Sequence, residues 1–199
     1  ETAAWAKLPF DEAEENAKIG VPSNFGEKGY TVLERIWARP TCDVNGITCG
    51  YQGEGAKTVL PAKASFKISF RLVPGQDPRI ILENFRKTMR ERCPSNVKIE
   101  FENHGASPAS VVPVNTPAAK LALEAIEEGF GQTPTFIRSG GSIPVVGLIR
   151  KELGIDTLLV GYGLPDDRVH SPDEKFDLDA FHAGIRTSAV LYAKLAGLK

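Results

Sequence analysis

A strict two-residue alternation over residues 63–73 constrains the fold of this chain more than any other feature. The segment reads KASFKISFRLV, with apolar side chains at every second position from Ala64 to Leu72 and Lys, Ser or Arg between them. Because successive side chains of a strand point to opposite faces, this pattern predicts a strand with one buried and one solvated face. The chain must therefore build a sheet that is covered on one side.

A helix and two further strands are predicted around this strand. The next segment reads GQDPRIILENFRKTMRERC, where Asp77 suits the N-cap position and Pro78 the first helical position. Downstream, NVKIEFE alternates again, and upstream YTVLERIWA, residues 30–38, is interpreted as another strand. This order predicts a small α+β unit with the helix on one face of an antiparallel sheet.

The pattern changes after about residue 105, where the chain reads GASPASVVPVNTP. This composition indicates a boundary, and we expect two domains, residues 1–112 and 113–199. Beyond it the sequence predicts, in turn, a helix opened by Thr116, a strand TPTFIR, a helix SIPVVGLIRKELG closed by Gly154, a strand DTLLVGYG and a helix capped by Asp177. Such alternation is typical of an α/β sheet, but two strands are too few, so we expect part of a larger α/β domain.

Composition excludes several classes of partner. The net charge is −1 with no basic cluster, and no run approaches ~20 apolar residues, so we expect neither nucleic acid nor membrane as a partner. The three cysteines have no CxxC spacing, which favours the reducing cytoplasm over a disulfide framework. Because the chain starts at Glu1 and its one methionine is Met89, we expect a cloned segment, a processed chain or a fragment.

A glycine-containing turn is the first candidate site. It reads RSGGSIP, residues 138–144, where Gly140 and Gly141 let the backbone approach a ligand and Ser142 is suited to cap the next helix. The backbone N–H groups at such a helix start favour an anion, either a carboxylate or a phosphate. The alternative is a strand-to-helix turn in which the glycines serve geometry alone.

A loop histidine is the second candidate. His170 lies in GYGLPDDRVHSPDEKF, between a predicted strand and the last helix, and ligands of α/β folds bind at the carboxyl ends of strands. The alternative is a solvated surface histidine. The other polar residues are not interpreted as functional. Asp166, Asp167, Asp173 and Glu174 are predicted to be surface acids, and His104 and His182 are predicted to be structural.

An arginine on the alternating strand is the third candidate. Arg71 shares the polar face with Lys63 and Lys67, and an arginine on a rigid strand suits bidentate recognition of a carboxylate. The alternative is a solvated sheet face.

Taken together and in order, four segments resemble one known family. They are NGITCGYQGEGAKT, GAKTVLPAKASFKISFRLVP, GGSIP and HSPDEKF. They are similar to the C-terminal half of the dinuclear zinc metallopeptidases that include carnosinase, cytosolic nonspecific dipeptidase, aminoacylase and glutamate carboxypeptidase. The resemblance begins at about residue 30 and is nearest to the dipeptidase branch. It implies a partial ferredoxin-like lid (dimerisation) domain followed by the C-terminal part of an α/β catalytic domain.

The resemblance also implies roles for individual residues. His170 would bind one of two bridged metal ions, which we expect to be zinc, with manganese or cobalt as alternatives. Arg71 and Thr58 would hold a small peptide substrate, with Thr58 serving the neighbouring subunit of a homodimer formed through the lid. Glu174 would organise the His170 loop. The substrate's free carboxylate would be held by the turn of Gly140, Gly141 and Ser142.

We therefore expect the C-terminal portion of a zinc-dependent, dipeptidase-like cytoplasmic hydrolase that cleaves dipeptide amide bonds. In that family the other metal ligands and the glutamate base precede the segment that this chain resembles. No catalytic residue is assigned within the chain, and the isolated chain is expected to be inactive. The alternatives are an N-acyl amino acid amidohydrolase of the same family and a non-catalytic dimerisation or binding module.

Overall fold

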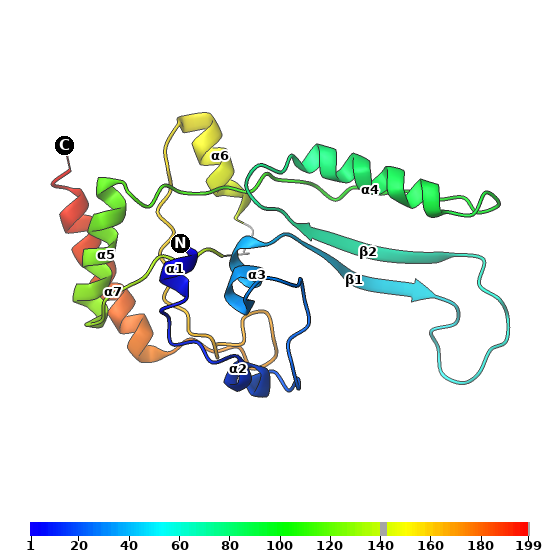
Figure 1. Cartoon of the computed structure of the whole chain (residues 1–199), viewed down its shortest axis with the longest axis horizontal. Helices are drawn as coiled ribbons and strands as arrows, with labels where there is room; N and C mark the ends of the chain where they lie inside the picture. Colours follow the sequence, from blue (N-terminus) through cyan, green and yellow to red (C-terminus); the bar gives the residue numbers. More distant parts are fainter. Residues whose placement is uncertain (140–142, 199) are drawn as a thin grey trace. The chain divides into compact units, whose positions relative to one another are not determined.

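The alternating segment forms strand β2, Ala64–Arg71, as predicted. The computed structural model describes residues 1–139 and 143–198 and shows two compact units (Figure 1). We call the unit that contains β2 the hairpin unit; it comprises Pro9–Ser110 and a short segment at Arg138. The helical unit comprises Glu1–Leu8, Val111–Ile137 and the chain from Ile143 onwards.

Strand β1, Thr41–Cys49, pairs with β2 as an antiparallel hairpin. The register runs from Thr41 opposite Arg71 to Cys49 opposite Ala64, with an irregularity between Val44 and Gly46. This extra residue shifts the phase of β1, so its apolar side chains alternate on either side of the irregularity but not across it. Because the irregularity interrupts the two-residue alternation, the sequence pattern does not predict β1.

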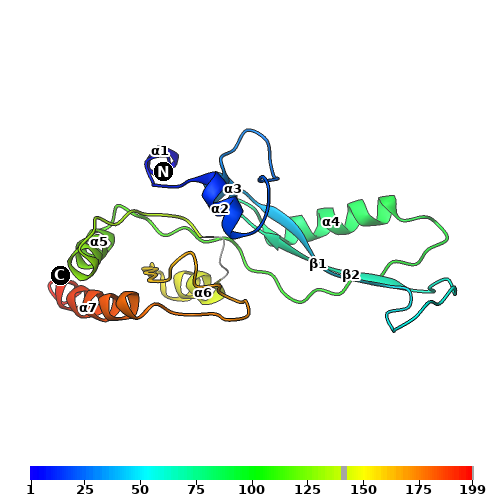
Figure 2. The same ribbon diagram turned by 90° about the horizontal axis from the view of Figure 1, so that it is seen from below.

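Helix α4, Pro78–Arg92, covers one face of the hairpin, as predicted; Figure 2 shows it running along the two strands. The Asp77 carboxylate caps it by accepting the Arg79 N–H at 2.8 Å. The Phe85 ring meets Phe70 of β2 edge-on at 5.3 Å between centroids and Phe101 at 6.3 Å. These aromatic contacts form the apolar layer between helix and sheet.

The expected strand at residues 30–38 is wrong, because this segment forms helix α3, Val32–Ala38. Thr31 and Glu34 form a capping box: the Thr31 hydroxyl accepts the Glu34 N–H, and the Glu34 carboxylate accepts the Thr31 N–H at 2.8 Å. This reciprocal pair satisfies backbone donors that a strand would leave to a neighbour. A further short helix, α2, Glu12–Lys18, precedes it.

Three other predicted strands do not form. Residues 97–101, 133–138 and 156–163 have no regular secondary structure. A strand requires a neighbour to accept and donate its backbone hydrogen bonds, and the described residues pair only β1 with β2. The mixed α/β class is correct, but the described chain contains one small antiparallel sheet and no parallel one.

The helices of the helical unit are α1 (Thr2–Trp5), α5 (Pro117–Phe130), α6 (Pro144–Leu153) and α7 (Leu178–Leu195). The predicted caps Thr116, Gly154 and Asp177 are all confirmed. At α6 the N-cap position is Ile143, and the predicted cap Ser142 lies outside the described residues. Within residues 1–139 and 143–198, no helix is long and apolar enough to span a bilayer.

Helices α5 and α7 pack closely because small side chains line their contact. The buried residues are Ala119, Ala122, Ala125 and Gly129 on α5, and Ala180, Ala183, Gly184 and Thr187 on α7. A Cβ atom at Gly129 would clash with the Thr187 hydroxyl and lie 3.0 Å from the Ala183 carbonyl oxygen. The backbones approach too closely at this point for any larger residue.

We therefore predict that Gly129→Ala destabilises the chain. The new methyl group must displace buried Thr187, which costs about 1–3 kcal/mol and outweighs the ~1 kcal/mol gained in helix propensity. Gly147→Ala in α6 is the matched control, because nothing lies within 4 Å of its added Cβ, and it should stabilise the chain slightly. Chemical denaturation monitored by circular dichroism measures both, and equal effects would contradict the close contact.

Candidate functional site

His170 lies in an exposed loop between the irregular segment 156–163 and helix α7. Two turns shape the loop, since Asp167 N donates to Leu164 O at 3.1 Å and Ser171 N donates to Arg168 O at 2.9 Å. Lys175 N then donates to Asp167 O at 3.0 Å and closes the loop at its base. The backbone of His170 is therefore held from both sides.

The prediction that Asp167 is a surface acid is wrong. Its side chain is 3% exposed, against 68% for the neighbouring Asp166. One carboxylate oxygen accepts the Leu164 N–H at 2.7 Å, and the other accepts the Lys175 ammonium at 3.1 Å. Both oxygens are engaged, which allows a charged group to be buried.

The Asp167 carboxyl and the Lys175 ammonium stabilise each other's charged form. The Leu164 N–H, followed by Lys175, lowers the pKa of Asp167 below its usual range. Hydrogen bonds to Asp166 and Asp167 raise the pKa of Lys175. The pair is therefore ionised throughout the neutral range.

The loop contains three residues in the left-handed backbone region. Arg168, His170 and Asp173 have φ angles of 54°, 64° and 59°. Residues with a Cβ adopt this region at a cost of order 1–3 kcal/mol each, so the surrounding contacts must enforce it. One such contact is made by the Glu174 carboxylate, which accepts the His170 N–H at 3.3 Å. This contact agrees with the expectation that Glu174 organises the loop.

Acid should open this loop only below the usual carboxylate range. Since the folded pKa of Asp167 is depressed, its stabilising contribution is present above the unfolded value, ~3.9, and is lost as pH falls through the folded pKa. An NMR titration should show the Leu164 amide shifting with a midpoint below ~3.9. Asp167→Asn should remove this transition and Asp166→Asn should retain it; a midpoint at the ordinary value would contradict the prediction.

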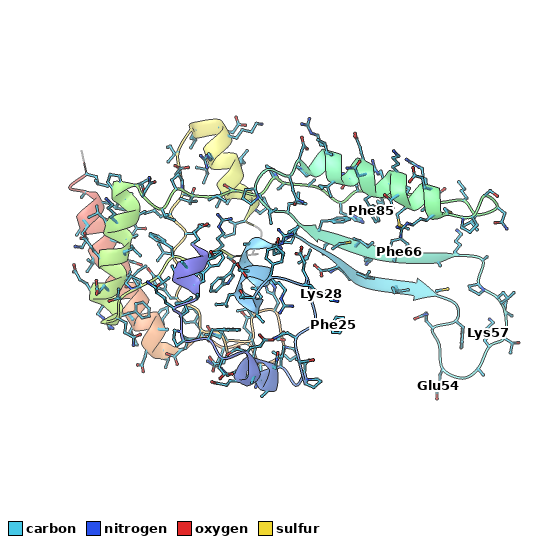
Figure 3. All side chains as sticks on the ribbon, viewed as in Figure 1. Phe25, Lys28, Glu54, Lys57, Phe66 and Phe85 are labelled. Atoms are coloured by element: carbon cyan, nitrogen blue, oxygen red, sulfur yellow. The ribbon has the colours of Figure 1, made fainter. Side chains whose placement is uncertain are left out.

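The hairpin places Arg71 and Thr58 at opposite ends. Arg71 is exposed at the end of β2, opposite Thr41. Thr58 follows Lys57 in the loop beyond the other end, which Figure 3 shows by the labelled Glu54 and Lys57. The strand between them spans about 23 Å at 3.3 Å per residue. One small peptide cannot contact both residues of the same hairpin.

Three of the predicted site residues belong to the segment that precedes α6. Gly140, Gly141 and Ser142 lie outside the described residues. Within the described part of the chain, no three His, Cys, Asp or Glu side chains form a group that could hold a metal ion. His170 is one imidazole donor, so these residues fit a single ligand position of a metal centre.

Comparison with known proteins finds homologues among the M20 peptidases. Residues 3–97 match the M20 profile described as Peptidase dimerisation domain. The chain is a homologue of the M20 metallopeptidases and contains their dimerisation domain. The resemblance drawn from the sequence motifs is thereby confirmed.

Several of the relatives are named as dipeptidases. Cys-Gly metallodipeptidase DUG1 of Candida albicans is 32% identical over 94% of this chain and 39% of that protein. Beta-Ala-His dipeptidase of Homo sapiens is 27% identical over 84% of this chain and 34% of that protein. The solved structure of the di-peptidase Dug1p from Saccharomyces cerevisiae matches with a TM-score of 0.83 and 28% identity, covering 100% of this chain and 42% of that one. The chain thus spans about two fifths of the length of the relatives it matches.

Proposed function

We propose that the chain is the C-terminal portion of a zinc-dependent, dipeptidase-like hydrolase. Residues 1–112 would form a partial lid and dimerisation domain, and residues 113–199 would end the α/β catalytic domain. The observation that most supports this proposal is the His170 loop, whose left-handed backbone is held by Asp167, Lys175 and Glu174. Homology to metallodipeptidases supports the metal-binding role that we propose for this histidine.

His170 supplies one ligand to the proposed centre. A zinc site uses about three or four protein ligands, so the other ligands and the general base come from outside these residues. Bound zinc acts as a Lewis acid and lowers the pKa of a coordinated water. The role of the loop is to fix the imidazole in one orientation. The 199-residue chain alone is expected to be inactive.

The hairpin unit binds substrate in this proposal. Arg71 pairs with the free carboxylate of a dipeptide, and the turn of Gly140, Gly141 and Ser142 donates backbone N–H groups to the same carboxylate. Thr58, at the opposite end of the hairpin, contacts substrate bound by a second copy of the chain. The lid-like region, residues 30–103, forms this homodimer, as the match to a dimerisation domain supports. We place the enzyme in the cytoplasm, where its three free cysteines stay reduced.

The test of the function is His170→Ala in the full-length protein that carries this chain. The substitution removes a metal ligand and should deplete bound zinc and abolish dipeptide hydrolysis. His104→Ala is the control, since His104 is an exposed histidine of the hairpin unit, 4.0 Å from Glu102, and both properties should persist. Elemental analysis and hydrolysis of Cys-Gly measure the two effects. Unchanged zinc content in His170→Ala, or no hydrolysis by the wild-type protein, would reject the proposal.

The proposed role of Arg71 is tested with a substrate amidated at its C-terminus. Losing a charge-assisted hydrogen bond to a desolvated carboxylate costs on the order of 2 kcal/mol, so Arg71→Ala should lower kcat/KM at least tenfold with metal content unchanged. The wild type should reject the amide, and the variant should discriminate far less. Lys67→Ala, on the same face of β2, should behave as wild type. A variant that rejects the amide as strongly as wild type would leave Arg71 on a solvated face.

A further inference from the structure

Two adjacent aspartates in the His170 loop have different environments. Asp166 is 68% exposed and contacts Lys175 at 3.1 Å. Asp167 is 3% exposed, contacts Lys175 at the same distance and also accepts the Leu164 N–H at 2.7 Å. The ion pair with Lys175 therefore does not distinguish them; burial and the backbone contact do.

The buried carboxylate joins the two ends of the loop. Leu164 lies before the left-handed residues and Lys175 after them, and Asp167 bonds to both with its side chain. Its own carbonyl oxygen accepts the Lys175 N–H at 3.0 Å. Because these contacts fix both ends, the residues between them have few alternative paths.

The Asp167 side chain lies close to the backbone at Gly163. A Cβ atom at Gly163 would lie 3.3 Å from the Asp167 Oδ2 atom, the one that accepts the Leu164 N–H. A buried charge is retained at a cost in desolvation, and removing one partner leaves the others unsatisfied. The structure therefore concentrates several constraints on the side chain of Asp167.

We infer that Asp167 is the positioning residue of the His170 loop. By binding Leu164 and Lys175, Asp167 holds His170 in its left-handed conformation. This inference rests on the proposed function for its consequence, since the residue being positioned is the proposed metal ligand. Asp167 acts through its contacts with the Leu164 N–H and the Lys175 side chain.

The first measurement is hydrogen exchange in the full-length protein, which does not depend on activity. An amide has one acceptor oxygen where a carboxylate has two, so Asp167→Asn must lose one of its two contacts. Exchange at the Leu164, His170 and Lys175 amides should accelerate at least tenfold in Asp167→Asn. The matched control, Asp166→Asn, should exchange as wild type.

The second measurement is the zinc dissociation constant. Residues that orient a ligand change metal affinity by about 10–100-fold when altered, so Asp167→Asn should weaken zinc binding at least tenfold. The melting temperature of the metal-free protein should stay near wild type, and saturating zinc should restore kcat with KM unchanged. Lys175→Arg should preserve affinity, whereas Lys175→Met should reproduce the defect.

If Asp167→Asn fails to fold, Gly163→Ala crowds the same oxygen without removing charge and should change amide exchange and zinc affinity in the same direction. Equal exchange and equal zinc affinity in Asp167→Asn and Asp166→Asn would overturn the inference. A failed proposed function gives a different result: His170→Ala would retain zinc, while the exchange difference between the two aspartate variants would persist.

Discussion

The hydrogen-bonded ladder between β1 and β2 is the interaction on which the hairpin unit depends. It sets Arg71 opposite Thr41 and leaves the loop that contains Thr58 beyond Cys49. It also aligns the apolar side chains of β2 on one face, where Phe70 meets Phe85 of α4. Without this register, neither the aromatic layer nor the separation of the two proposed substrate contacts would exist.

In the helical unit, side-chain contacts hold the segment that leads to the His170 loop. Its segment 156–163 has no ladder, and Tyr162 instead stacks on Phe130 with centroids 5.8 Å apart and shares a hydrogen bond with Ser188 of α7. A few residues later, a carboxylate accepts the Leu164 N–H. Side-chain contacts thus anchor Tyr162 to α5 and α7, and a side-chain acceptor for the Leu164 N–H begins the His170 loop.

Local signals in the sequence predicted some elements correctly and not others. The alternation of β2 and the caps Asp77 and Asp177 depend on neighbouring residues only, so they were predictable. The α3 helix was also predictable, because the spacing of Thr31 and Glu34 is that of a capping box, a signal that the β-branched residues around it obscured.

Other features depend on contacts that no local pattern reports. The irregularity near Val44 hid β1, since it breaks the two-residue period. Asp166 and Asp167 are identical neighbours in the sequence, and only the path of the loop decides which one is buried. The expected strands after residue 97 had suitable side chains but no partner among the described residues, and strand formation depends on both.

The geometry of the hairpin constrains how the proposed enzyme can be assembled. About 23 Å separates the two ends of β2, which exceeds the length of a dipeptide, so Arg71 and Thr58 of one chain cannot serve one substrate. If both contact substrate, each hairpin must contribute to two sites, and a two-fold dimer is the smallest closed arrangement that allows this. Dimerisation in this proposal is then part of substrate binding, because a monomer would lack the contact made by Thr58 even with every residue of its own chain in place.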